Sequence, residues 1–181
     1  MKILISGGSR NGKSAFAERE ILRLADGGPL YYVATMIPFD GEDRERIRRH
    51  IRERDGLGFE TLEQGRDIAA CLKRAKPNAS FLVDSVTALL MNEQYPVSFE
   101  EAPDPEAAVR CRDGLLALAK QAKNAVFVTD YIYSDAARYG AETESFRASL
   151  AFVDAALAAV CDQVIEFCAG NVIYHKGGSG R

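Results

Sequence analysis

A phosphate-binding sequence lies near the start of the chain. Residues 7–14 read Gly-Gly-Ser-Arg-Asn-Gly-Lys-Ser and match the pattern G-x-x-x-x-G-K-[ST], between an apolar segment and a helix expected to begin near Lys13. In such a loop, glycines let backbone N–H groups turn inward around a phosphate, and the helix N-terminus adds partial positive charge. Lys13, expected as an exposed loop lysine, would reach the outer phosphates, and Ser14 would hold Mg²⁺. The predicted nucleotide-binding residues are Gly7, Gly8, Ser9, Arg10, Asn11, Gly12, Lys13 and Ser14. The alternative is a tight turn that contains Lys-Ser by chance.

An acidic residue that could share this metal ends a second apolar segment. Phe81–Asp84 (Phe-Leu-Val-Asp) is typical of a buried strand. In nucleotide-hydrolysing proteins, an aspartate at the end of a strand near the phosphate loop helps to hold Mg²⁺. Asp84 is therefore a candidate metal ligand with Ser14. An aspartate in this position can equally cap the following helix, which is the alternative interpretation.

One of the two histidines lies in a basic segment. Residues 44–54 contain six arginines, and helical periodicity places Arg46 and Arg54 one turn on either side of His50. Nearby cations favour the neutral, nucleophilic imidazole, and the same guanidinium groups could clamp a triphosphate. The alternative is a solvated, salt-bridged helix face with an incidental histidine. The second histidine, His175, is interpreted as structural.

These residues require a scaffold in which strands alternate with helices. The expected strands are Met1–Ser6, Leu30–Thr35, Phe81–Asp84, Ala125–Thr129, Gln163–Phe167 and Val172–His175. The expected helices are Ala15–Ala25, Asp40–Arg54, Arg66–Ala75, Pro105–Ala122 and Glu142–Val160. This alternation implies right-handed crossovers and an α/β fold, with a mostly parallel sheet covered by helices on both faces. An irregular surface segment is expected at Tyr95–Pro105, and a frayed tail at Gly177–Arg181.

Length, charge and cysteine spacing limit the classes of protein to which the chain can belong. With 181 residues and 19.8 kDa, we expect one nucleotide-binding domain spanning residues 1–181. The net charge of -3 offers no general attraction to nucleic acid or to anionic lipid. There is no apolar run near the roughly 20 residues that span a bilayer, and no signal peptide, so a cytoplasmic protein is expected. The four cysteines match no zinc or redox spacing and are interpreted as buried, reduced thiols.

In combination, these motifs resemble a known enzyme family. The phosphate loop, Tyr-Val-Ala-Thr at 32–35 and Arg-Ile-x-x-His at 46–50 occur in the order and spacing of the bifunctional adenosylcobinamide kinase/adenosylcobinamide-phosphate guanylyltransferases of cobalamin biosynthesis. The resemblance covers nearly the whole chain. It continues through Phe59–Glu63, Phe81–Asp84, Thr87, Asn92, Phe146-Arg147, Cys161–Val164 and Gly170–Lys176.

The resemblance implies a homotrimer with a P-loop NTPase-like fold and one site for two reactions. In the first, ATP or GTP phosphorylates the aminopropanol hydroxyl of adenosylcobinamide. In the second, GTP transfers GMP to that phosphate through a guanylylated histidine, releasing pyrophosphate and giving adenosylcobinamide-GDP. The family's histidine matches His50. Besides the phosphate loop, its nucleotide contacts match Ala34, Thr35, Met36, Ile51, Arg52, Glu53, Arg54, Glu63 and Asp84.

One residue and one loop depart from the family pattern. Phe59 replaces a usual tryptophan, and Asp130-Tyr131-Ile132-Tyr133, followed by Ser134-Asp135, replaces the family's Asn-Glu-Val-Gly. The altered loop could touch the corrinoid or a neighbouring subunit and so bears on which corrinoid is accepted.

Two other functions remain open. One is a small-metabolite kinase in which His50 only binds phosphate, and the other is a GTP-dependent regulatory module with negligible turnover.

Overall fold

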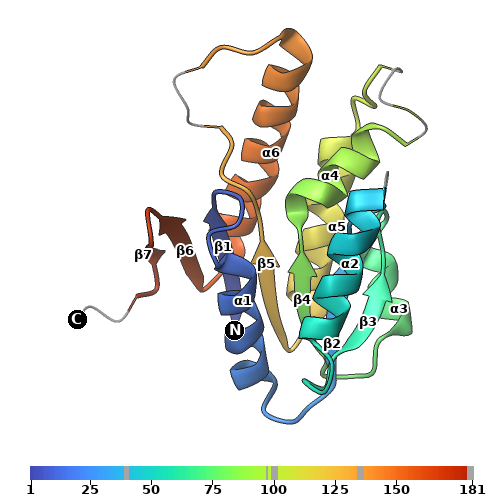
Figure 1. Ribbon diagram of the computed structural model, residues 1–181, viewed down its shortest axis with the longest axis vertical. Helices are drawn as coiled ribbons and strands as arrows, with labels where there is room; N and C mark the ends of the chain where they lie inside the picture. Colours follow the sequence, from blue (N-terminus) through green and yellow to red (C-terminus); the bar gives the residue numbers. More distant parts are fainter. Residues whose placement is uncertain (39–40, 97, 99–101, 134–136, 179–181) are drawn as a thin grey trace.

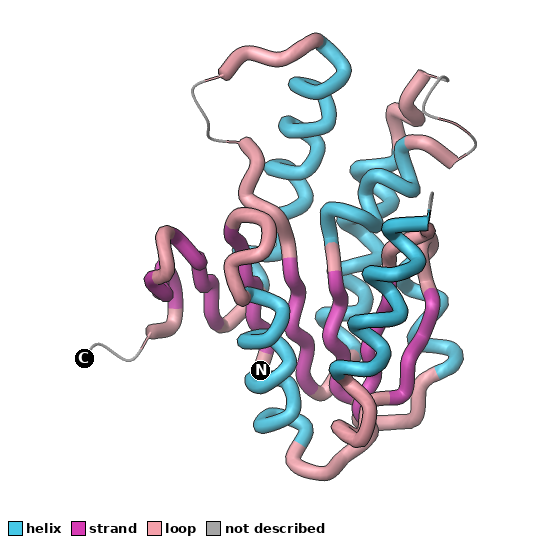
Figure 2. The backbone as a smooth tube through the Cα atoms, in the orientation of Figure 1, coloured by secondary structure: helices cyan, strands magenta, loops and turns pink. Residues whose placement is uncertain are grey.

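The computed structural model describes residues 1–38, 41–96, 98, 102–133 and 137–178, without the side chains of Glu42, Arg46 and Glu53. Within these residues, seven strands form one sheet in the order β3-β2-β4-β5-β1-β6-β7 (Figures 1 and 2). The strands are β1 (Lys2–Gly7), β2 (Leu30–Ala34), β3 (Glu60–Glu63), β4 (Ser80–Asp84), β5 (Asn124–Val128), β6 (Gln163–Cys168) and β7 (Asn171–Lys176). Neighbouring strands are parallel except β6 and β7. The predicted α/β fold with a mostly parallel sheet is confirmed.

Helices cover both faces of the sheet. They are α1 (Lys13–Ala25), α2 (Gly41–Glu53), α3 (Cys71–Arg74), α4 (Val86–Gln94), α5 (Ala107–Gln121) and α6 (Ala141–Val160), with a 3₁₀ turn η1 (Ile68–Ala70). In Figure 1, α1 and α2 lie in front of the sheet and α5 lies behind it. None of the helices in the described ranges is long and apolar enough to cross a membrane.

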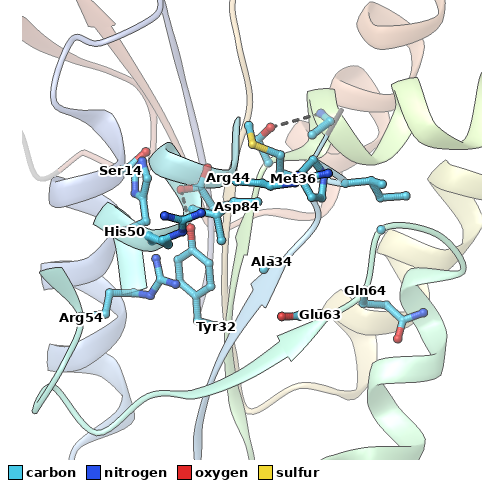
Figure 3. A pocket seen from close by; sticks show the side chains of 17 residues that line it. Ser14, Tyr32, Ala34, Met36, Arg44, His50, Arg54, Glu63, Gln64 and Asp84 are labelled. Atoms are coloured by element: carbon cyan, nitrogen blue, oxygen red, sulfur yellow. Dashed lines mark hydrogen bonds between the residues drawn. The ribbon is translucent and has the colours of Figure 1, made fainter. Parts of the chain in front are cut away.

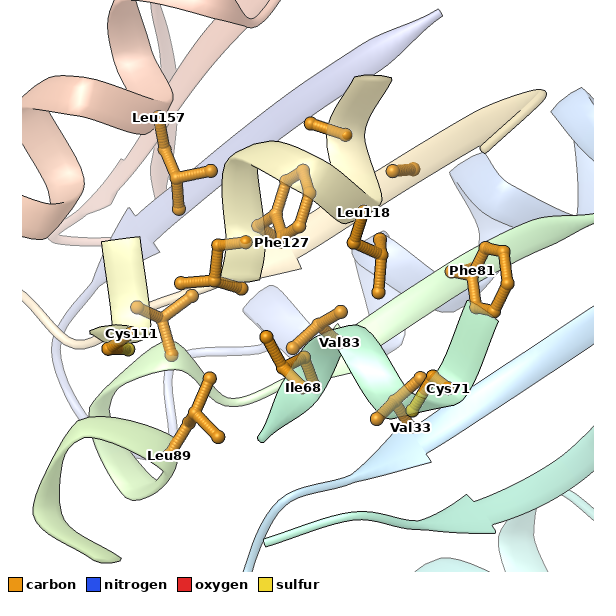
Figure 4. Close-up of a cluster of buried hydrophobic side chains, with 14 of the residues drawn as sticks. Val33, Ile68, Cys71, Phe81, Val83, Leu89, Cys111, Leu118, Phe127 and Leu157 are labelled. Carbon is orange, nitrogen blue, oxygen red and sulfur yellow. The ribbon is translucent and has the colours of Figure 1, made fainter. Parts of the chain in front are cut away.

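The central strands are apolar on both sides because helices bury both faces. On β4, Leu82 packs with Ile21 of α1, whereas Phe81 and Val83 belong to the larger cluster on the opposite face. Figure 4 shows that larger cluster, to which α4, α5 and α6 contribute. Burying one such side chain is worth about 1.5–3 kcal/mol. The two cores therefore hold the carboxyl ends of the strands, where the predicted site residues lie, in fixed positions.

Three elements differ from the sequence-based expectation. Strand β3 was not predicted because it reads Glu-Thr-Leu-Glu, and Leu62 is its one buried residue. Helix α4 was also not predicted, although it begins directly after Ser85, whose hydroxyl oxygen accepts a hydrogen bond from the Ala88 N–H at 3.2 Å. The helix expected at Arg66–Ala75 is instead η1 followed by the single turn α3. Asp67, with φ 45°, is in the left-handed region and prevents an earlier start.

The cysteines are all unpaired, as expected, but they are not all buried. Cys71, Cys111 and Cys161 lie in the core, and burial raises the pKa of Cys71 to about 11 and that of Cys161 to about 12. These thiols are therefore unreactive at neutral pH. Cys168 is exposed at the end of β6, where the chain turns into β7, so the expectation of burial was wrong for this residue.

Candidate functional site

The loop between β1 and α1 has the backbone that a phosphate site needs. Gly12 precedes the helix with φ 91°, a conformation that side-chain-bearing residues rarely adopt. At Gly7, a Cβ atom would lie 2.7 Å from the Phe167 carbonyl oxygen, so no larger residue fits there. The first turn of α1 contains no acidic residue, and its partial positive charge is therefore not neutralised by its own side chains.

The loop lysine is buried rather than exposed, which corrects the sequence-based expectation. Lys13 is only 7% exposed. Its ammonium group donates to the Gly8 carbonyl oxygen at 3.0 Å and pairs with Asp130 Oδ1 at 2.8 Å. The Lys13 side chain thus folds back over the loop, in position to meet a phosphate held by the loop amides.

A cleft of about 500 Å³ opens beside this loop (Figure 3). It brings together residues from α1, α2 and the carboxyl ends of β2, β3 and β4 that are far apart in the sequence. In Figure 3, Ser14, His50 and Arg54 lie toward one end of the cleft, and Glu63 and Gln64 lie toward the other. The predicted site residues that line it are Ser14, Ala34, Met36, His50, Arg54, Glu63 and Asp84.

Asp84 is available to a ligand and does not cap the next helix. Ser85 caps α4, so the capping alternative does not hold for the Asp84 side chain. Asp84 Oδ2 accepts a hydrogen bond from Tyr32 Oη at 2.9 Å. The Ser14 hydroxyl and the Asp84 carboxylate line the same cleft and are oxygen donors of the kind that Mg²⁺ prefers. A Mg²⁺ site of this type uses one or two carboxylates together with substrate phosphates, and these residues fit it.

Arg54 joins the basic helix to the floor of the cleft. Its guanidinium carbon lies 3.3 Å from the centroid of the Tyr32 ring, and the residue is 6% exposed. The Arg54 Nε and Nη1 atoms are buried and have no hydrogen-bond partner among the described residues. Burial, with the Asp84 carboxylate adding to it, raises the pKa of Tyr32 well above 10, so Tyr32 remains a donor to Asp84. A buried cation with free N–H donors in a cleft is suited to an anionic ligand.

Helix α2 therefore has two kinds of surface. The exposed Glu45 and Arg48 pair at 3.0 Å, as the solvated-face interpretation expects, although Arg48 also lines the cleft. His50 on α2 and Arg54, which directly follows the helix, both line the cleft. The solvated-face interpretation consequently holds for part of the helix and not for His50.

Some predicted nucleotide contacts lie outside the cleft lining. Thr35 is fully buried, and its hydroxyl donates to the Ser85 carbonyl oxygen at 2.8 Å and accepts from the Ser85 N–H at 2.7 Å. It thereby fixes the turn that presents Asp84. Ile51 and Arg52 are exposed, and the side chains of Glu53 and Arg46 are outside the described structure. Their roles in binding remain predictions, as do those of Ser9, Arg10 and Asn11 in the loop.

Several cleft residues were not identified from the sequence. Three of them, Arg44, Ile47 and Arg48, lie on α2, the helix that contains His50. They could have been found from the sequence, because Ile47 and Arg48 lie three and four residues after Arg44 and therefore share its side of the helix. The remaining residues have no local signal and reach the cleft through the sheet topology. They are Tyr32, Ile37, Pro38, Gln64, Gly65, Ser85 and Ala88.

A buried carboxylate lies on α6 and contacts the segment that follows β5. Asp154 of α6 is 4% exposed and accepts hydrogen bonds from Thr129 Oγ1 at 2.9 Å and from Tyr133 Oη at 3.0 Å. Burial raises the pKa of Asp154 from 3.8 to about 7, although both hydrogen bonds act in the opposite direction. The protonated form of Asp154 is thus favoured in the folded protein.

This raised pKa predicts a pH dependence of stability. Between about pH 4 and 7, the folded protein holds a proton that the unfolded chain releases, so the free energy of unfolding should fall as pH rises through this window. Asp154→Asn cannot ionise at this position and serves as the reference. Relative to it, the free energy of unfolding of the wild type should fall by on the order of 4 kcal/mol between about pH 4 and 7, with no further fall at higher pH. Urea unfolding of both proteins from pH 4 to 8 measures the difference. Parallel stability curves would show that the buried carboxylate ionises without cost.

Comparison with known proteins places the chain in a family. The model of the family described as cobinamide kinase / cobinamide phosphate guanyltransferase matches residues 3–174. A bifunctional adenosylcobalamin biosynthesis protein of Pseudomonas aeruginosa is 41% identical over 93 residues, which are 51% of this chain and 52% of the relative. One from Escherichia coli is 30% identical over 105 residues, which are 58% of this chain and 56% of the relative. The chain spans about half the length of the curated relatives it matches.

Solved structures agree on the fold alone. The flagellar accessory protein FlaH of Methanocaldococcus jannaschii aligns with 99% of this chain and 81% of its own, with a TM-score of 0.51 and 13% identity. A solved ATPase domain aligns with 99% of this chain and 78% of its own, with a TM-score of 0.54 and 11% identity. The P-loop NTPase-like fold is thus confirmed. Because the family model matches residues 3–174, which include the phosphate loop, α2 and β2 to β6 in full, this chain belongs to the cobinamide kinase / cobinamide phosphate guanyltransferase family.

Proposed function

We propose that this protein phosphorylates the aminopropanol hydroxyl of adenosylcobinamide with ATP or GTP, and then transfers GMP from GTP to that phosphate through His50. The observation that supports both steps most directly is the shared cleft: Ser14 of the phosphate loop, Asp84 and His50 line one cavity of about 500 Å³. Family membership supports the choice of the corrinoid substrate.

The kinase step requires charge neutralisation and alignment rather than covalent catalysis. The loop N–H groups and Lys13 would bind the outer phosphates. Ser14 and Asp84 would hold Mg²⁺, which supplies positive charge against the phosphate oxygens. The acceptor hydroxyl would then attack the γ-phosphorus. Its oxygen forms the new P–O bond as the bond to the nucleoside diphosphate breaks, and the hydroxyl proton passes to solvent.

The transfer step requires a nucleophile at the α-phosphorus. A ring nitrogen of His50 would form a bond to this phosphorus as the bond to the bridging oxygen breaks and pyrophosphate leaves. An oxygen of the corrinoid phosphate would then attack, breaking the P–N bond and restoring the imidazole. Arg54, buried beside the same cleft with unpaired N–H donors, is placed to bind a phosphate oxygen during both displacements.

The remaining parts of the proposal concern surroundings and partners. A homotrimer is proposed from the family resemblance, and the exposed Val172, Ile173 and Tyr174 on the edge strand β7 are compatible with contact to another subunit. The partners are adenosylcobinamide, its phosphate and the two nucleotides, without nucleic acid. A cytoplasmic location fits these metabolite substrates.

Labelling with GTP tests the proposed transfer. Incubation with Mg²⁺ and GTP labelled at the α-phosphate should leave label on the protein, whereas γ-labelled GTP should leave none, because the outer two phosphates depart. The bond should be acid-labile and base-stable, as a phosphoramidate is. Bound GTP without label on the chain would contradict the transfer step and favour a kinase in which His50 only binds phosphate. Absence of any turnover with a corrinoid would favour a regulatory module.

A further inference from the structure

A short ion pair at the site involves a residue that the proposed chemistry does not use. Asp130 follows β5, which lies between β1 and β4 in the sheet. The side chain therefore stands between the phosphate loop and the strand that ends in Asp84. Its Oδ1 lies 2.8 Å from the ammonium nitrogen of Lys13.

Backbone hydrogen bonds on both sides fix the position of Asp130. The Asp130 N–H donates to Thr87 Oγ1 at 2.9 Å. The Thr129 N–H donates to the Ile5 carbonyl oxygen at 2.9 Å, and the Tyr131 N–H donates to the Gly7 carbonyl oxygen at 3.1 Å. The segment is thus joined to α4, to β1 and to the first residue of the phosphate loop. The backbone of Asp130 is therefore held in place beside the phosphate loop.

Because Lys13 is buried, its ion pair with Asp130 matters for the stability of the loop. The Lys13 side chain is 8% exposed, and the Asp130 side chain is 33% exposed. A buried ammonium needs an opposite charge, because removal from water without one costs several kcal/mol. In the structure, Asp130 supplies that charge, and the Gly8 carbonyl oxygen supplies a second acceptor. The outer phosphates of a nucleotide would supply the same charge, and the carboxylate would then be a like charge beside them.

We propose that Asp130 is a positioning residue that holds Lys13 over the phosphate loop and competes with nucleotide phosphates for its ammonium group. The inference rests on the proposed function only in that the loop binds a nucleoside triphosphate. It has two consequences of opposite sign. The Asp130 charge stabilises the protein without ligand, and the same charge weakens nucleotide binding.

The test replaces Asp130 by Asn, which keeps the shape and removes the charge. The dissociation constant for GTP with Mg²⁺, measured by calorimetry, should fall about tenfold, near the low end of the coupling measured for close charge pairs. The melting temperature of the ligand-free variant should fall by about 2–4 °C, because the buried Lys13 loses its partner. Asp130→Ser should shift both quantities in the same directions. A purely structural role would lower stability and weaken binding together, and that result would overturn the proposal.

A double-mutant cycle tests whether the effect acts through the lysine. In a Lys13→Met background, Asp130→Asn should lose most of its effect on GTP binding. An equal tightening in both backgrounds would mean that Asp130 acts on the nucleotide directly, and the proposal would be wrong. Asp113→Asn is the matched control, because Asp113 is an exposed aspartate on α5 that pairs with Arg112 at 2.7 Å. It should change the GTP dissociation constant less than twofold.

These measurements separate the inference from the proposed function. They need GTP binding only, so they give an answer even if the wild-type protein is never labelled by α-labelled GTP. Label on the wild type with no change in affinity for Asp130→Asn would leave the proposed function intact and overturn the inference. Wild-type protein that binds no GTP would overturn both.

Discussion

Lys13→Ala is expected to lower both phosphorylation of the corrinoid and transfer of GMP by at least ~10²–10³-fold, the usual loss when one preorganised donor to a developing charge is removed. Both reactions should fall together, because each must neutralise the outer phosphates at the same loop. The two turnover rates are measured separately, with adenosylcobinamide and with its phosphate as substrates.

Burial of Lys13 makes the folding control important. The variant leaves Asp130 without its ion-pair partner, so circular dichroism and melting temperature have to accompany the assays. Lys120→Ala, at an exposed residue near the end of α5, should leave both rates unchanged. Normal turnover in either reaction by a folded Lys13→Ala protein would refute the single shared site.

His50→Asn should separate the two reactions. Guanylylation of the chain and GMP transfer should fall ~10⁴-fold or more, because a covalent route loses its nucleophile. Phosphorylation of adenosylcobinamide should stay within about tenfold of wild type, because that step needs alignment and charge neutralisation but no covalent enzyme intermediate. The retained label from α-labelled GTP and the two product rates are the measurements.

The other histidine provides the control. His175 is exposed on β7, outside the cleft, and its Nε2 lies 2.6 Å from Glu166 Oε2. His175→Asn should be labelled like the wild type. If His50→Asn is still labelled, the nucleophile is another residue. If it loses phosphorylation as strongly as transfer, His50 serves the common binding of phosphates rather than covalent chemistry.

The parts of the site that were predictable have local signals. The phosphate loop is a contiguous pattern between a strand and a helix, and the structure forms it from those residues. Asp84 ends an apolar run, and the structure places it at the carboxyl end of β4. His50 and Arg54 follow helical spacing, and both line the cleft. Each of these inferences depended on a short stretch of consecutive residues.

The parts that were missed depend on contacts between distant segments. Tyr32 reads as a buried strand residue, and only the pairing of β2 with β4 brings its hydroxyl to Asp84. The Asp130 contact requires β5 to lie beside β1, which no local pattern specifies. Strand β3 contains too little apolar surface to be recognised without its partner β2.

The place of β1 in the sheet has a consequence for how the protein is made. This first strand of the chain is flanked by β5 and β6, which come from residues 124–128 and 163–168. Asn11 of the phosphate loop also donates to the Phe167 carbonyl oxygen at 3.1 Å. During synthesis, β1 leaves the ribosome before β5 and has no strand partner until residues 124–128 have followed it. Closing such a loop carries a large entropic cost before any contact repays it. The phosphate loop therefore reaches its final position late, after β5 and β6 have paired with β1.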